Sequence, residues 1–246
     1  MKKVSVLVII LLIVLLIVVI FFVTSTKKGH VYDYNELKGL FKTGDILLFT
    51  YGYYKSAMER IEYFGRTKLL GSSYGHVGVI LKDNDGKLFV VEICDVGHCA
   101  DDKAIMSNNK GSGGVRIIDL ETILSRYTKE YDGSFGVKFI DKEIPYETMI
   151  KNISKYDDVI FQDRKSIAML VIASTCTPYT IASKLAKKYD KSRMVCSEFV
   201  YDILRDCKVL KDTYDSKLFW PHTITTSVFT DLTIVPYSTV VDMKYS

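Results

Sequence analysis

Two apolar segments joined by a short polar turn constrain the fold of this chain most strongly. "YGHVGVIL" (74–81) and "KLFVVEIC" (87–94) stand on either side of a turn that contains Asn84, Asp85 and Gly86. Runs of this length and composition around a Gly-containing polar turn are typical of a β-hairpin. We expect Asn84 to Gly86 to form the loop, with Gly86 in the left-handed region, so that the residues that flank it pair with each other.

The length of that loop decides which face of the hairpin carries Glu92. In the expected register, Glu92 lies opposite Gly78 and one diagonal step from His76, on the same face of the hairpin. Diagonal neighbours are about 7–8 Å apart at the backbone, within reach of a long side chain. A loop one residue shorter would turn Glu92 to the other face, because side chains alternate along a strand.

Cys196 stands at the start of "CSEFVYDIL", whose apolar residues recur at helical spacing. Ser192 or Asp190 is expected to cap this helix, which places Cys196 in the first turn. A helix N-terminus and a nearby imidazolium both lower the pKa of a thiol from about 8.5. The alternative is that Cys196 is a core residue, since cysteine is among the residue types most often buried. We take Cys196 as the candidate nucleophile.

His76 and Glu92 are the candidate partners of that thiol. Among the 4 histidines of the chain, His76 begins a strand and has glycine at 75 and 78, which suits a general base. Glu92 is a charged residue inside an apolar strand, so we expect it to have a partner and to orient the imidazole. Tyr74 precedes His76 by two residues, on the same expected face. It is a candidate to contact the substrate or its oxyanion, or else it only covers the site.

These residues lie in motifs whose order resembles a known family. "FKTGDILLF", "SSYGHVGVI", "VVEI" and "MVCSEFVYDIL" resemble the permuted NlpC-type papain-like hydrolases, which include the YiiX-like group and relatives in large DNA viruses. In that family the histidine strand precedes the cysteine helix. The resemblance covers about residues 41–209, and it matches Gly44-Asp45, His76, Glu92 and Cys196 to the family pattern. It implies an α+β domain of circularly permuted NlpC/papain-like fold, with a central antiparallel sheet flanked by helices.

The resemblance implies thiol chemistry at an amide or ester, and three functions follow. The first is a thiol hydrolase that uses a Cys-His-Glu triad on a peptide-like or lipid acyl substrate. The second is a lipid acyltransferase or thioesterase on the same site. The third is a non-catalytic structural or binding protein of a virion or membrane. A thiol that titrates near 8.5, the ordinary value of a free cysteine, would favour the third function.

The N-terminus carries an apolar run over residues 4–23, with lysines on both sides. A helix of that length spans a hydrocarbon core of roughly 30 Å. The run is longer than the ~7–15 residues of a signal peptide core, and no small-residue cleavage site follows it. We therefore predict a single-pass transmembrane anchor with its basic flank over 1–28, which binds membrane lipids, and a hydrolase domain over 29–246.

Composition argues against several other classes. The formal net charge is only +4, with no basic patch, so a nucleic acid partner is not expected. "CDVGHC", from Cys94 to Cys99, could form a disulfide, or could bind zinc together with Cys176 or Cys207. Zinc sites more often show two spaced ligand pairs, so no metal is expected, and no organic cofactor is implied.

Overall fold

The computed structural model describes residues 30–52, 73–95, 106–107, 113–176, 178–186, 188–189 and 192–246. Several expected features lie outside these residues. They are the apolar run 4–23 and the segment 96–99 that carries His98 and Cys99. The segment "KSAMERIEYF" (55–64), whose apolar spacing predicts a helix, also lies outside them.

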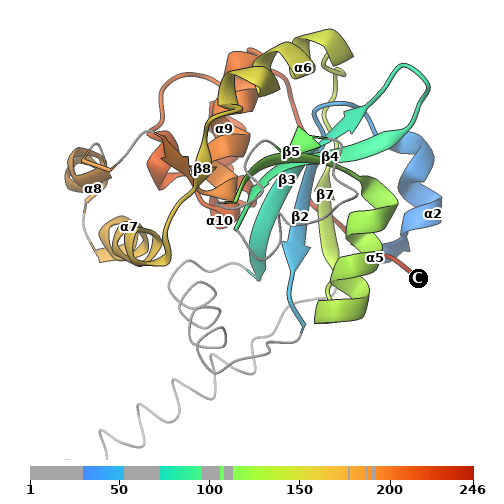
Figure 1. The fold of residues 1–246 in the computed structure, drawn as a ribbon, viewed down its shortest axis with the longest axis horizontal. Coiled ribbons are helices and arrows are strands. Elements are labelled where there is room, and N and C mark those ends of the chain that lie inside the picture. The colour runs from blue at the N-terminus through green and yellow to red at the C-terminus, as the bar shows by residue number, and fades with distance from the viewer. Residues whose placement is uncertain are drawn as a thin grey trace, which may run out of the picture. The chain divides into compact units, whose positions relative to one another are not determined.

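A mainly antiparallel sheet forms the centre of the described structure (Figure 1). Its strands lie in the order β1-β10-β7-β2-β3-β4-β6-β5. In chain order they are β1 (Val31–Asp33), β2 (Ile46–Thr50), β3 (Tyr74–Lys82), β4 (Leu88–Cys94), β5 (Met106–Ser107), β6 (Gly114–Asp119), β7 (Phe135–Lys138) and β10 (Val241–Lys244). A separate parallel pair joins β8 (Ile160–Phe161) to β9 (Arg193–Met194).

Helix α9 (Cys196–Asp206) is the helix that the sequence predicts after Cys196, and further helices surround the sheet. The described helices are α2 (Tyr34–Leu37), α5 (Leu120–Tyr131), α6 (Tyr146–Ile153), α7 (Arg164–Cys176), α8 (Tyr179–Ala186), α9, α10 (Pro221–Ile224) and α11 (Ser227–Leu232), with short 3-10 turns η1 (Lys38–Leu40), η2 (Ser154–Tyr156) and η3 (Ser216–Leu218). Pro178 separates α7 from α8, as a residue without a backbone N–H should. Helices α6, α10 and α11 were not expected from the sequence.

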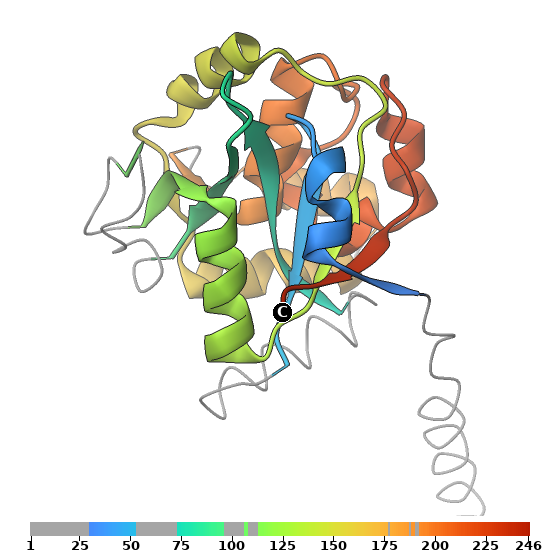
Figure 2. The same cartoon turned by 90° about the vertical axis from the view of Figure 1, so that its right-hand side faces the viewer.

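The two faces of the sheet bury two different cores. Figure 2 shows α2 and α5 in front of the sheet and α9 behind it. Alternation along the strands divides the apolar residues: Val77 and Val79 of β3 pack on the α9 side, and Ile80 packs on the α2–α5 side. This expected layering of helices on a central antiparallel sheet agrees with an α+β domain.

The Gly-Asp pair before β2 holds two distant segments together. Gly44 has φ of +105°, a conformation that favours glycine. Asp45 is fully buried, and its carboxylate accepts the backbone N–H groups of Lys42 and Ile140, both at 2.7 Å. This motif therefore fixes the entry of the central strand β2 against the segment that follows β7.

The register of the β3–β4 hairpin is the one predicted. Val79 pairs with Val91 and Lys82 pairs with Leu88. The loop closes with the N–H of Asp83 donating to the Lys87 carbonyl at 3.0 Å, and Gly86 has φ of +82°. The side chains of β4 therefore point to the faces that the sequence indicated.

The prediction of a transmembrane helix in this fold, and of a membrane location, is corrected by the structure. Among the residues that the structure describes, no helix is both long enough and apolar enough to cross a membrane. The run 4–23, on which the prediction depended, lies outside those residues.

Candidate active site

Cys196 is the first residue of α9. Its predecessor Val195 has an extended backbone (φ −94°, ψ 163°) and is the N-cap, in place of the expected cap Ser192. The other expected cap, Asp190, lies outside the described residues. The first bond of the helix runs from the N–H of Phe199 to the Val195 carbonyl at 3.0 Å. The thiol therefore sits at the positive end of the helix dipole, where backbone N–H groups have no partner within the helix.

The side chains of His76 on β3 and Glu92 on β4 form a buried hydrogen bond. His76 Nε2 lies 2.7 Å from Glu92 Oε2, and the two residues are 7% and 0% exposed. Gly78 lies opposite this part of β4 in close contact: a Cβ at that position would lie 2.6 Å from Val90 Cγ1. The diagonal contact expected from the hairpin register is thus formed.

Cys196 forms a hydrogen bond with the imidazole of His76, in addition to the one made by Glu92. Burial on its own would lower the pKa of His76, but the negative charges of Glu92 and Cys196, and side-chain hydrogen bonds to both, raise that pKa to about 10. Since Glu92 engages Nε2, Nδ1 is the ring nitrogen left to face the sulfur. The structure therefore brings together all three residues of the expected triad.

Arg116 is a fourth member that the sequence analysis did not find. It lies on β6 directly opposite Glu92. Its Nε donates to Glu92 Oε1 at 2.7 Å and its Nη2 lies 2.5 Å from the same oxygen, while the whole residue is 1% exposed. Glu92 thus binds Arg116 through one carboxylate oxygen and His76 through the other.

This arrangement keeps the carboxylate charged despite its burial. Burial alone would raise the pKa of Glu92, but the charges of Arg116 and His76 and their hydrogen bonds lower it to about 2. A charged Glu92 in turn favours the imidazolium form of His76. The chain of charges Arg116–Glu92–His76 is therefore set to stabilise a thiolate on Cys196.

Aromatic side chains hold the imidazole ring from the α5 side of the sheet. The ring of Tyr127 lies nearly parallel to that of His76, at 14° and 6.3 Å between centroids, and the ring of Phe49 lies 5.2 Å away. Tyr127 is fixed by a hydroxyl contact to Tyr51 at 3.2 Å. These apolar walls limit the rotation of His76 and exclude water from one side of it.

Tyr74 is not where the sequence analysis expected it. The ladder between β2 and β3 shifts, with Phe49 opposite His76 but Thr50 opposite Tyr74, so an extra residue at Gly75 forms a bulge. Tyr74 therefore packs against the core on the α9 side, and its hydroxyl donates to Asp242 Oδ1 at 3.0 Å. A contact of Tyr74 with substrate or oxyanion stays a prediction.

Cys94, Cys207 and His222 have other surroundings in the part of the chain that the structure describes. Cys94 is disulfide-bonded, and Cys207 is a partly buried thiol that accepts from Asn152 at 3.2 Å. His222 is in α10, and its pKa is lowered by burial. Within the described residues no group of three or more His, Cys, Asp or Glu side chains is arranged to hold a metal ion.

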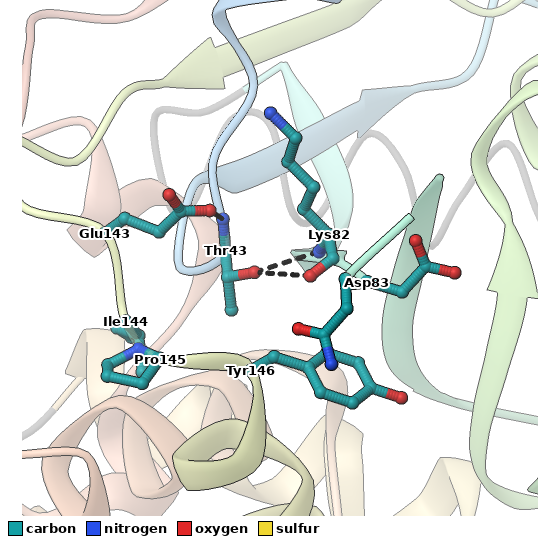
Figure 3. Close-up of a pocket in the computed structure, with 8 residues that line it drawn as sticks. Thr43, Lys82, Asp83, Glu143, Ile144, Pro145 and Tyr146 are labelled. Atoms are coloured by element: carbon teal, nitrogen blue, oxygen red, sulfur yellow. Dashed lines mark hydrogen bonds between the residues drawn. The ribbon is translucent and has the colours of Figure 1, made fainter. Parts of the chain in front are cut away.

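A pocket of about 360 Å³ lies away from the triad residues, beside the tip of the β3–β4 hairpin (Figure 3). Figure 3 shows Thr43, whose hydroxyl bonds the backbone of Lys82, next to Glu143 and Tyr146. None of its lining residues belongs to the triad: they are Thr43, Lys82, Asp83, Asn84, Glu143, Ile144, Pro145 and Tyr146. The pocket is therefore separate from the candidate active site.

Comparison with known proteins gives a relative but no described activity. No protein-family model matches the chain. The chain is 39% identical over 200 residues to "Uncharacterized protein R372" of Acanthamoeba polyphaga mimivirus, an alignment that covers 81% of this chain and 79% of the relative.

Proposed function

We propose that this chain, which belongs to the same family as the mimivirus protein R372, is a cysteine hydrolase that cleaves an amide or ester bond. The observation that carries the proposal is the double contact of His76, with Glu92 at 2.7 Å on one side and a hydrogen bond to Cys196 on the other. A thiol that only packs in a core has no need of a buried, charged imidazole beside it.

The catalytic cycle begins with a thiolate–imidazolium pair. Cys196 gives its proton to His76, and the thiolate attacks the carbonyl carbon of the substrate. The negative charge then moves to the carbonyl oxygen, where N–H groups of the first turn of α9 can receive it. His76 passes its proton to the leaving amine or alcohol, and an acyl-enzyme remains on Cys196.

The second half of the cycle returns the enzyme to its starting state. His76, now neutral, takes a proton from a water molecule as that water attacks the acyl carbon. The thioester bond breaks and the carboxylic acid leaves. The sulfur departs as a thiolate beside His76, which keeps the proton that it took from water, so the thiolate–imidazolium pair is restored. Glu92 and Arg116 stay charged throughout and hold the ring in position, since neither reaches the reacting atoms through any step.

The resemblance of the motifs to permuted NlpC-type hydrolases supports the same assignment. The family pattern of a histidine strand, an acidic residue on the next strand and Cys-Ser-Glu at a helix start corresponds to His76, Glu92 and Cys196 in this chain. The described fold places these residues on β3, β4 and the start of α9. Order in the chain and proximity in space therefore support one function.

The pH dependence of Cys196 alkylation tests the proposal without a known substrate. Iodoacetamide modification of this thiol, followed by mass spectrometry of its peptide, should give a pKa well below 7 in the wild-type chain. His76→Ala should raise that pKa toward about 8.5, the value of a free thiol. Cys207, whose pKa is raised by burial, serves as the internal control. A Cys196 that titrates at 8.5 or above in the wild-type chain would reject the enzyme and favour a non-catalytic role.

A further inference from the structure

A second buried ion pair joins the first turn of α9 to η3, and the triad does not use it. Lys217 Nζ lies 3.0 Å from Glu198 Oε1, and the two residues are only 7% and 4% exposed. Glu198 follows Cys196 by two residues, in the first turn of α9, and Lys217 comes from η3. Buried charges of this kind are uncommon, because both must be removed from water.

The pair also binds the backbone that leads into the nucleophile. Lys217 Nζ donates to the Arg193 carbonyl at 3.3 Å. The Glu198 carboxylate accepts the backbone N–H of Val195, the N-cap of the helix. This second contact is the half of a capping box in which the residue at N3 reaches back to the N-cap. The backbone before Cys196 is thus held at the Arg193 carbonyl and at the Val195 N–H. The ion pair with Lys217 also holds Glu198, in the helix after Cys196.

We propose that Lys217 and Glu198 are positioning residues that fix the backbone of Arg193 to Val195 against the first turn of α9, and so hold the Cys196 sulfur against His76. The proposal rests on the function proposed above and names further residues of that same site. It explains the Glu of the Cys-Ser-Glu motif, for which the sequence indicates no chemical role. Neither side chain touches the reacting atoms: both act through the backbone on either side of the sulfur.

Energetics favour this role over a purely stabilising one. A buried ion pair can often be replaced by apolar residues of similar volume without loss of stability. Burial raises the pKa of Glu198 to about 7, against the attraction of Lys217, so keeping this carboxylate charged is costly. An apolar pair could not make the hydrogen bonds that Lys217 and Glu198 form with the Arg193 carbonyl and the Val195 N–H.

The experiment measures the pKa of Cys196 by iodoacetamide alkylation, with each variant first checked for folding by circular dichroism. Lys217→Met should raise the thiol pKa by about one unit, and thereby slow alkylation about tenfold at pH values below the wild-type thiol pKa. Because this variant leaves Glu198 unpaired, the double variant Lys217→Met/Glu198→Leu, which removes both charges, should fold and show the same shift. Glu198→Gln should stay near the wild-type value, since Gln can still accept the Val195 N–H.

Two lysines provide matched controls. Lys155 pairs with Asp206 at 3.0 Å in the last turn of the same helix, and Lys138 is a buried lysine of β7 that donates to the Ile224 carbonyl at 3.2 Å. Lys155→Met and Lys138→Met should leave the thiol pKa unchanged. If the folded double variant titrates like the wild-type chain, the positioning role is wrong while the hydrolase proposal stands. If the wild-type thiol itself titrates at about 8.5, both proposals are overturned.

Discussion

Arg116 and Glu92 face each other on neighbouring strands, and the guanidinium binds one carboxylate oxygen while His76 binds the other. Both residues are almost completely buried, and the positive charge of Arg116 helps to keep the Glu92 carboxylate ionised. Their contact links the middle of the sheet to the imidazole, and through it to the thiol.

Removing Arg116 should therefore destabilise the whole fold. Arg116→Met leaves the Glu92 carboxylate buried with only His76 as partner, and should lower the free energy of unfolding by about 3–5 kcal/mol. Urea denaturation followed by circular dichroism measures this change. Lys155→Met, which breaks the more exposed pair with Asp206, should cost no more than about 1 kcal/mol. Equal effects in both variants would contradict the special role of the buried pair.

Glu92→Gln should distinguish the effect of the negative charge of Glu92 from the effect of its hydrogen bond to His76. The amide can still bind His76, but the negative charge that raises the pKa of His76 is lost. The imidazole pKa should fall from about 10 toward its ordinary value of 6.5, and the pKa of Cys196 should rise. NMR titration of the His76 ring and alkylation of the thiol report the two shifts. An unchanged ring pKa would show that the carboxylate does not control it.

The thiolate–imidazolium pair should also set a pH window for reaction. Because the pKa of His76 is raised to about 10, the imidazolium is present at all lower pH values and is lost as the pH rises through 10. The proton required by the leaving group is therefore available at neutral pH. We expect hydrolysis of a reporter ester to show a plateau from the thiol pKa to about pH 9 and to decline above about 10. A decline already centred near 6.5 would mean that Glu92 and Cys196 do not raise the His76 pKa.

A side chain at Gly136 should clash with Tyr74 and destabilise the fold. A Cβ at Gly136 would lie 2.5 Å from the Tyr74 hydroxyl oxygen and 2.7 Å from Cζ. Gly136→Ala should lower the free energy of unfolding by about 1–3 kcal/mol, as overpacked cores do. Gly39→Ala is the control, since nothing lies within 4 Å of a Cβ there. Tyr74→Leu in the Gly136→Ala background should restore part of the loss, and its failure to do so would contradict the proposed clash.

The triad could be predicted from local signals that act over short distances. The loop at Asn84 to Gly86 determines the hairpin register, and this register brings Glu92 within reach of His76. The helical spacing after Cys196 likewise indicates the start of α9. These features depend on turn geometry and side-chain alternation, which neighbouring residues in the sequence largely determine.

The parts that were missed depend on contacts between distant segments. Arg116 stands alone among apolar residues of β6 just as Glu92 does in β4, which was a usable signal, but the pairing of these strands cannot be read from either segment alone. The bulge at Gly75 moved Tyr74 to the other face, because one extra residue reverses the alternation. The contact of Glu198 with Lys217 likewise needed the position of η3.

The hairpin that carries His76 and Glu92 also limits how the family can change. Its loop, closed by the hydrogen bond between Asp83 and Lys87, follows the end of β3, whereas His76 lies near the start of that strand. Even so, gain or loss of a single loop residue would send the carboxylate to the opposite side of the sheet, leaving Arg116 and His76 without their shared anion. An odd-numbered insertion at this exposed tip is therefore expected to break the contacts of Glu92 with His76 and Arg116, whereas a substitution there should leave them intact.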